Sequence, residues 1–172
     1  MVKRRRWTIE QILSGALALL GFAGCNTSKE IRVLYGTPSV DYRVTGKVTD
    51  KQGNPLENIQ VVITHPLGRR YVNENGEKLT DRTDPGTGEI LPDTLYTDKK
   101  GKFIGHKVNG FSFGQTTVDI QDIDGSENGG LHDEQHISIT EFNKKQTKKQ
   151  KRFYSGEFKF TQTIKLTKRN KQ

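Results

Sequence analysis

The sequence predicts an all-β protein, an antiparallel Greek-key β-sandwich of about seven short strands that follows an N-terminal signal-peptide helix. Short stretches in which apolar and polar residues alternate recur along the chain, and turn-forming residues separate them. The 172 residues include 18 glycines, which is typical of a turn-rich β architecture. No window after Phe22 has the helical period of about 3.6 residues over a long stretch.

The first two strands are predicted on either side of a turn. Residues 42–49 alternate apolar and polar side chains, which is the period of a half-buried strand. Gly53 and Pro55 then supply turn chemistry, and residues 59–64 form a second strand rich in β-branched side chains. We expect these strands to form a hairpin or a corner between two sheets.

The segment 65–93 is rich in Gly, Pro, Asn and Asp, with one short strand expected near residues 70–72. So long an irregular stretch is unusual within a domain, and it predicts either a binding loop or a flexible insertion. A further hairpin is expected where residues 94–97 and 102–106 flank a turn. The last strands are predicted at residues 116–120, 136–140 and 157–166.

Charge is distributed unevenly along the chain, whose formal net charge is +8. Residues 108–142 contain no Lys or Arg, whereas a basic run follows directly at residues 144–152. A basic run of this kind is typical of a nucleic-acid or anionic-surface patch, or of a solvated loop. We interpret it as a solvated loop and expect no nucleic-acid partner, because no aromatic residues interleave with it and the chain carries an export signal.

The N-terminus is typical of an export signal. Basic residues at positions 3–6 precede the apolar run 12–22, which is shorter than the roughly 20 residues that span a bilayer. The sequence Phe22-Ala23-Gly24-Cys25 then resembles the lipobox of bacterial lipoproteins. That resemblance implies a diacylglyceryl group on Cys25 and cleavage just before it. The alternative is a plain signal peptide with an unmodified cysteine.

These features predict four regions: a signal peptide at 1–24, a lipidated tether at 25–40, the β-sandwich at 41–167 and a basic tail at 168–172. Asn26 follows the cysteine, which by resemblance to lipoprotein sorting signals favours the outer membrane, facing the periplasm or the cell surface. Because Cys25 is the only cysteine, its lipidation leaves no thiol for a disulfide or a nucleophile.

Two stretches of the predicted domain, residues 46–61 and 97–103, resemble the carboxypeptidase regulatory-like domain, a transthyretin-like sandwich. The lipobox together with residues 35–38, 42–50 and 122–130 is similar to the lipoproteins associated with radical SAM proteins. This second resemblance implies a cell-envelope location and a radical SAM enzyme or an envelope protein as partner.

The acidic segment 119–128 is the best candidate for a ligand site. Asp122, Asp124, Glu127 and Asn128 offer the oxygen ligands that Ca²⁺ prefers, but the spacing does not fit an EF-hand. The alternative is an acidic turn held by its own hydrogen bonds. His132 and His136 do not fit the zinc-protease motif, because Asp133 stands where that motif has Glu, and we expect both to be surface histidines.

No phosphate-binding glycine loop, nucleophile elbow or CxxC pair is present, so the sequence predicts no enzyme and no required cofactor. The leading hypothesis is a non-enzymatic, lipid-anchored β-sandwich that acts as a binding or accessory module in the cell envelope. One alternative is a substrate or cargo that a partner radical SAM enzyme modifies. The other is a calcium-dependent adhesive module.

Overall fold

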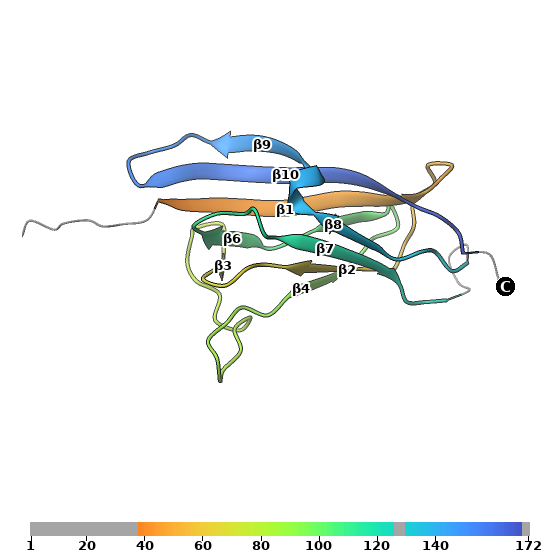
Figure 1. Ribbon diagram of the computed structural model, residues 1–172, viewed down its shortest axis with the longest axis horizontal. Helices are drawn as coiled ribbons and strands as arrows, with labels where there is room; N and C mark the ends of the chain where they lie inside the picture. The colour runs from red at the N-terminus through yellow and green to blue at the C-terminus, as the bar shows by residue number, and fades with distance from the viewer. Residues whose placement is uncertain (1–37, 126–129, 170–172) are drawn as a thin grey trace, which may run out of the picture. The chain divides into compact units, whose positions relative to one another are not determined.

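The computed structural model describes residues 38–125 and 130–169, and within them the chain is almost entirely β (Figure 1). Ile139–Glu141 forms one turn of 3-10 helix, and no helix of the described residues is long and apolar enough to cross a bilayer. The strands are β1 (Ser39–Asp50), β2 (Ile59–Thr64), β3 (Arg70–Val72), β4 (Asp93–Tyr96), β5 (Lys102–Ile104), β6 (Lys107–Gly110), β7 (Thr117–Asp122), β8 (Gln135–Ser138), β9 (Asn143–Lys148) and β10 (Tyr154–Leu166).

These strands form two sheets that pack face to face. The six-stranded sheet has the order β3-β6-β1-β10-β9, with β5 also paired to β1, and the four-stranded sheet has the order β4-β2-β7-β8. β1 and β10 run parallel to each other, from the pair Ser39–Tyr154 to the pair Asp50–Leu166. All other strand pairs are antiparallel.

The core lies between the two sheets and is built by the alternation of side chains along the strands. Val44 and Val48 of β1 face inward, as do Val61 and Ile63 of β2, and all four are almost completely buried. Burying a side chain of this size stabilises the fold by about 1.5–3 kcal/mol. The residues that alternate with them, such as Arg43 and Lys47 of β1 and Gln60 of β2, lie on the outer faces. The alternation in the sequence therefore fixes which face of each strand packs in the core.

The predicted all-β sandwich is confirmed, and residues 59–64 and 70–72 form β2 and β3 with the expected bounds. Two details differ from the prediction. The described chain has ten strands rather than about seven, and the β1–β10 pair is parallel. The two strands that the sequence did not predict are β6, which begins with a buried lysine, and β9, whose six residues are all exposed.

β9 corrects the interpretation of the basic run as a solvated loop. Most of residues 143–148 pair with β10, and the run continues into the turn that connects the two strands. Lysines on an edge strand discourage pairing with another chain, which is a physical reason for their presence there. The segment 65–93 is also more ordered than expected, because it contains β3 and two short bridged turns, Val72–Lys78 and Thr83–Ile90.

The described residues begin at position 38, so the predicted signal peptide, Cys25 and nearly all of the tether lie outside them. At the other end, Lys168 bridges to His132, and Arg169 donates its backbone N–H to the carbonyl of Leu131.

Candidate ligand groove

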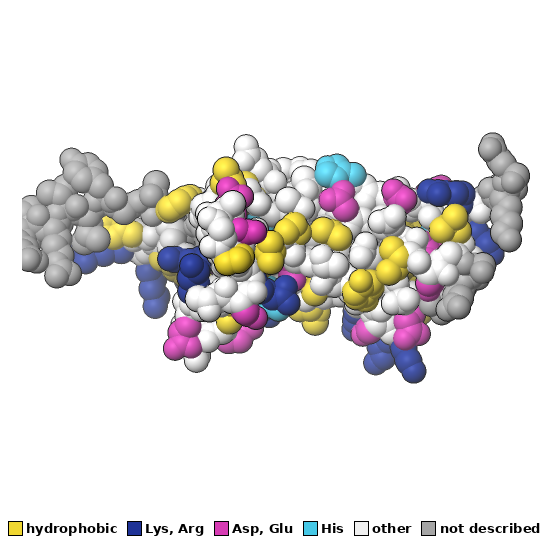
Figure 2. Space-filling model, turned by 90° about the horizontal axis from the view of Figure 1, so that it is seen from below, with side chains coloured by type: hydrophobic (Ala, Val, Ile, Leu, Met, Phe, Trp, Pro, Cys, Tyr) yellow, Lys and Arg dark blue, Asp and Glu magenta, His cyan; other side chains and the backbone are white. Residues whose placement is uncertain are grey.

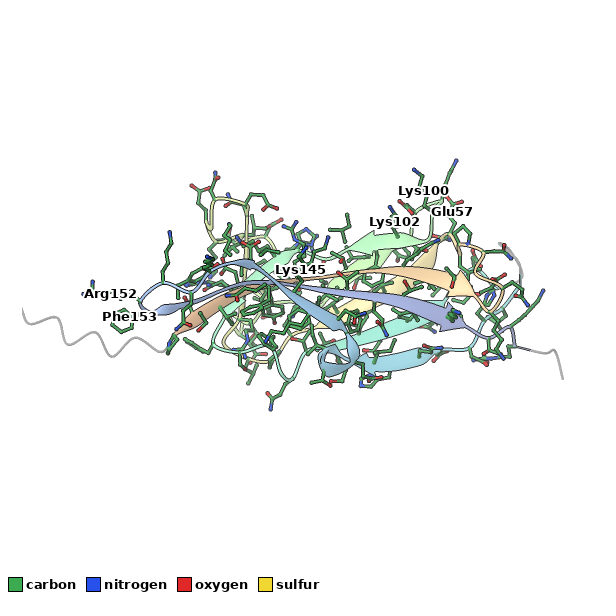
Figure 3. The ribbon with its side chains drawn as sticks, turned by 90° about the horizontal axis from the view of Figure 1, so that it is seen from above. Glu57, Lys100, Lys102, Lys145, Arg152 and Phe153 are labelled. Carbon is green, nitrogen blue, oxygen red and sulfur yellow. The ribbon has the colours of Figure 1, made fainter. Side chains whose placement is uncertain are left out.

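The outer face of the six-stranded sheet, opposite the core, carries a hollow of about 450 Å³ that we call the outer groove. Arg43, Thr45 and Lys47 of β1 face this side, because they alternate with the buried Tyr42, Val44 and Val48. Further lining residues come from β5 and β10, among them Lys102, Lys159 and Thr161. Figure 3 shows Lys102 on this side of the molecule and Lys145 near its middle.

Strand register arranges the cations of this face in rows, and all of them except Lys145, which lies beside the outer groove, line the hollow itself. Arg43 pairs with Lys159, and Lys159 pairs with Lys145, so three cations lie side by side across β1, β10 and β9. Directly opposite residues in a sheet have Cβ atoms about 4.5–5.5 Å apart. The second row, four residues further along β1, consists of Lys47 and its antiparallel partner Lys102. Along a strand, four residues correspond to about 13 Å.

Few acidic groups compensate these rows. Arg43 forms an ion pair with Glu74, a side chain that is 76% exposed. Within the described part of the chain, Lys47, Lys102, Lys145 and Lys159 have no carboxylate within ion-pair distance. Between the rows, the paired Thr45 and Thr161 and the exposed Ile104 supply hydroxyl groups and one apolar side chain.

One end of the outer groove is balanced in charge. Lys107, which is only 4% exposed, lies 3.3 Å from Asp41 and 3.0 Å from Glu157, and Lys148 lies 2.9 Å from the same Glu157. Burial would by itself raise the pKa of Glu157, but hydrogen bonds from Lys148 and Lys107 hold it at about 2. Burial would by itself lower the pKa of Lys107, but its hydrogen bonds to the carboxylates of Glu157 and Asp41 raise it. This cluster therefore fixes β1, β6, β9 and β10 to one another.

A second polar cluster lies at the edge of the core, where the segment 65–93 meets the sheets. Asp93 is fully buried, and its carboxylate lies 3.0 Å from Arg82, 2.8 Å from Nδ1 of His106 and 2.6 Å from the His106 backbone N–H. These contacts use the acceptor capacity of Asp93 to hold the segment in place. Asp93, Arg82 and His106 do not line the outer groove.

His65 lies close to this cluster, with its Nδ1 3.0 Å from the hydroxyl of Tyr42. The Tyr42 hydroxyl also lies 3.0 Å from that of Thr116, and the ring of Tyr71 packs edge-on against His65. Burial disfavours the charged imidazole and lowers the pKa of His65 to about 4. The imidazole is therefore neutral at pH 7.

The candidate calcium ligands are only partly within the described residues. Asp122, at the end of β7, is nearly buried, and its Oδ2 accepts a hydrogen bond from the backbone N–H of His132 and lies 2.9 Å from that residue's Nδ1. Asp124 lies in the turn that follows, whereas Glu127 and Asn128 fall outside the described residues. Within residues 38–125 and 130–169, no three His, Cys, Asp or Glu side chains are placed to share a metal ion. The calcium loop stays a prediction, as does lipid on Cys25.

The histidine prediction is half wrong. His136 is at the surface, but His132 is buried at 3% exposure by its contacts with Asp122. The outer groove was missed by sequence reasoning, because its residues lie up to 120 positions apart. They meet through the parallel β1–β10 pair, for example Arg43 with Lys159, and through the antiparallel β1–β5 pair, for example Lys47 with Lys102. The one local signal was the lysine content of residues 144–152.

Comparison with family models and with characterised proteins finds no match. Among solved structures, the chain is similar to 3-chlorocatechol 1,2-dioxygenase from Rhodococcus opacus 1CP (11% identity, TM-score 0.43) over 77% of this chain and 61% of that one. It is also similar to catechol 1,2-dioxygenase from Pseudomonas arvilla C-1 (12%, TM-score 0.46; 78% and 54%). A third is the C-terminal domain of the shaft pilin spaA from Lactobacillus rhamnosus GG (14%, TM-score 0.36; 75% and 98%).

The chain thus spans less than two thirds of the length of the two dioxygenases. At these identities and TM-scores the likeness concerns strand arrangement, and no activity passes from it to this chain. The neighbours nevertheless include enzymes, which contradicts the expectation that this sandwich marks a non-enzymatic binding or accessory module. We correct that expectation: the β-sandwich arrangement is shared by enzymes and by a pilin domain.

Proposed function

We propose that the outer groove binds an extended anionic polysaccharide along the direction of β1 and β10. The observation that carries the proposal is the pair of like-charged rows, Arg43–Lys159–Lys145 and Lys47–Lys102, which lie directly opposite one another across strands.

Like charges that face each other across a sheet destabilise it, whereas opposite charges in the same positions stabilise it by about 0.2–1 kcal/mol for each pair. Cations that served only solubility could stand at positions that are not directly opposite one another and so avoid this repulsion. Carboxylates spaced along a polymer relieve the repulsion in both rows at once, since the rows lie about 13 Å apart. Between the rows, the hydroxyl oxygen of the exposed Thr161 can accept a hydrogen bond from a sugar hydroxyl, whereas Thr45 is buried and donates to the carbonyl of Phe160. Ile104, which is 64% exposed, can pack against a sugar ring.

The proposal includes a location. The lipobox resemblance supports lipid on Cys25, and Asn26 directly after the cysteine supports attachment to the outer membrane by resemblance to lipoprotein sorting signals. The resemblance to the radical SAM-associated lipoproteins supports an enzyme of that class as a neighbour, and this partnership stays a prediction. Intact mass of the mature protein from its host tests the anchor, because a diacylglyceryl thioether adds the mass of a glyceryl group and its two acyl chains.

Binding can be tested by calorimetry on residues 25–172 carrying Cys25→Ser, with polygalacturonate as the anionic ligand and dextran as the neutral one. All the core residues lie between Val40 and Leu166, so this chain keeps the whole core. The test variant replaces Lys47, Lys102, Lys145 and Lys159 with Gln. A matched control for part of that charge change is the double variant Lys51→Gln/Lys78→Gln, which removes two exposed lysines outside the groove.

We expect the parent protein to bind polygalacturonate with an affinity that falls as the salt concentration rises, and not to bind dextran. Four exposed ion pairs worth about 0.5 kcal/mol each would together change the affinity by more than tenfold. The groove variant should lose at least that factor, and the control should stay close to the parent. Equal binding of dextran and polygalacturonate, or an unchanged affinity in the groove variant, would contradict the proposal.

A further inference from the structure

Three large apolar side chains are exposed at the end of the sandwich where β1 begins. Leu67 is 72% exposed, Phe111 is 58% exposed and Phe153 is 42% exposed. They come from three different loops, and we call them together the apolar tip. A single exposed apolar residue is ordinary on a protein surface, but a group at one end indicates an interface.

Strand register brings the members of the apolar tip together. The backbone N–H of Ser39, the first residue of β1, donates to the carbonyl of Phe153 at 2.9 Å. Val40 pairs with Gly110, the last residue of β6. Phe111, the next residue, therefore lies beside Ser39 on the side opposite to Phe153. Adjacent strands are about 4.8 Å apart, which places Phe111 and Phe153 about 10 Å from each other.

Leu67 joins this group through the next residue of its loop. A Cβ atom added to Gly68 would lie 3.7 Å from the ring of Phe111, so the loop of Leu67 packs against that phenylalanine. Arg69 of the same loop donates a hydrogen bond to the hydroxyl of Ser112. The two loops therefore form one surface at this end of the sandwich.

Basic side chains flank the apolar tip. Lys149, Lys151 and Arg152 lie in the turn between β9 and β10, are exposed, and have no ion-pair partner among the described residues. Figure 3 shows Arg152 and Phe153 together at this end, and Figure 2 shows Lys and Arg side chains beside hydrophobic ones there. Apolar side chains next to unpaired cations are the combination that binds the surface of an anionic bilayer.

The path of the chain also points to a membrane. Cys25 precedes Ser39 by 14 residues, a length of chain that reaches about 50 Å at most. If Cys25 carries lipid, as we propose above, the end of the sandwich nearest to the bilayer along the chain is the one that carries the apolar tip. β1 and β10 run lengthwise away from this end, so the outer groove would face sideways and stay open to its ligand (Figure 1).

We infer that the apolar tip, with Lys149, Lys151 and Arg152, docks the sandwich directly onto an anionic lipid surface. This contact is separate from the lipid anchor and from the outer groove. It would insert three side chains from neighbouring loops into the headgroup region while the cations meet lipid phosphates. Its effect is to hold the domain in one orientation on the bilayer.

The test is sedimentation of the unlipidated chain, residues 25–172 with Cys25→Ser, with vesicles of phosphatidylcholine and phosphatidylglycerol (70:30) or of phosphatidylcholine alone. The apolar variant carries Leu67→Ser, Phe111→Ser and Phe153→Ser. Its matched control carries Tyr96→Ser and Ile123→Ser, which are 51% and 47% exposed. Both lie at the start of β2, because Tyr96 pairs with Gln60 and Ile123 follows Asp122, the partner of Ile59, whereas Leu67 follows the end of β2. The charge variant carries Gln at positions 149, 151 and 152.

We expect the parent to bind the anionic vesicles and to bind neutral ones at least tenfold less, because each cation near an anionic surface contributes about fivefold in partitioning. The apolar variant and the charge variant should each lose at least tenfold on anionic vesicles, and the matched control should bind as the parent does. Thermal melts confirm that each variant is folded. The four-lysine groove variant should bind vesicles within about threefold of the parent while losing polysaccharide, which separates this inference from the groove proposal.

Three outcomes would overturn the inference. In the first, the folded parent binds no anionic vesicles. In the second, the matched control loses as much binding as the apolar variant. In the third, the parent forms a dimer by size-exclusion chromatography that the apolar variant abolishes, which would assign the tip to a second copy of the chain.

Discussion

His65 makes a specific contribution to acid sensitivity. Burial lowers the pKa of its imidazole to about 4 in the folded protein, from 6.5 for an unperturbed histidine. As the pH falls below 6.5, the unfolded chain takes up this proton and the folded protein does not, so stability is lost. The loss continues until about pH 4, where both states are protonated, and amounts to about 3 kcal/mol over that window.

The substitution His65→Gln tests this reasoning, because glutamine can still accept a hydrogen bond from Tyr42 but does not titrate. Urea unfolding followed by far-UV circular dichroism at pH 7, 6, 5 and 4.5 gives the free energy of unfolding. The variant should be less stable than the parent at pH 7, by about 1–2 kcal/mol. Its stability should fall less steeply between pH 6.5 and 4. The two curves should therefore converge and then cross above pH 4, because the loss of about 3 kcal/mol in the parent exceeds the difference at pH 7.

The other groups with shifted pKa values act in a different range. Glu157 has its pKa lowered to about 2, so its contribution to the free energy of unfolding is present above about pH 4.5 and is lost only as the pH falls toward 2.

The matched control for His65→Gln is His136→Gln, which removes a histidine whose side chain is 66% exposed. Parallel curves for the parent and His65→Gln over pH 6.5–4 would refute the assignment of this acid sensitivity to His65.

Two further substitutions test the buried polar contacts. Thr97→Val leaves the N–H of Ile59 and the carbonyl of Leu56 without their hydrogen-bond partner. It should lower the free energy of unfolding, measured in urea, by about 2–4 kcal/mol. Thr97→Ser keeps the hydroxyl and should lower it by less than half of that. Asp93→Ala removes the acceptor that holds Arg82 and His106 and should cost about 2–3 kcal/mol. Asp133→Ala breaks only a half-exposed ion pair with Arg169 and should cost under about 1 kcal/mol, so an equal loss in both aspartate variants would contradict the role of Asp93.

The sequence predicted those strands whose burial alternates. β2 was predicted with its bounds because Ile59, Val61 and Ile63 are buried and the residues between them are not. β9 could not be predicted in this way, because none of its six residues is buried and its pairing with β10 is the only reason that it is a strand. β6 was missed because it begins with a lysine, whose burial depends on Asp41 and Glu157 of two distant strands.

The outer groove shows the same limit more clearly. Local patterns assign each residue to a face, and Arg43 and Lys47 could be placed on the polar face of their strand. They do not show that Lys159 lies beside Arg43, because that depends on a parallel pair between the first and last strands. His132 was misjudged for a related reason, since its burial follows from a contact with Asp122 across ten residues.

The parallel pairing of β1 with β10 also has a consequence for biosynthesis. A ribosome makes β1 among the first residues of the domain and β10 last, so β1 lacks this neighbour until residues 154–166 have emerged. Pairing of segments so distant in sequence is slow, and the apolar face of β1 is exposed to chaperones and proteases throughout. A premature stop codon at position 154, which removes β10 and the six residues after it, would therefore yield a degraded chain rather than a shorter domain.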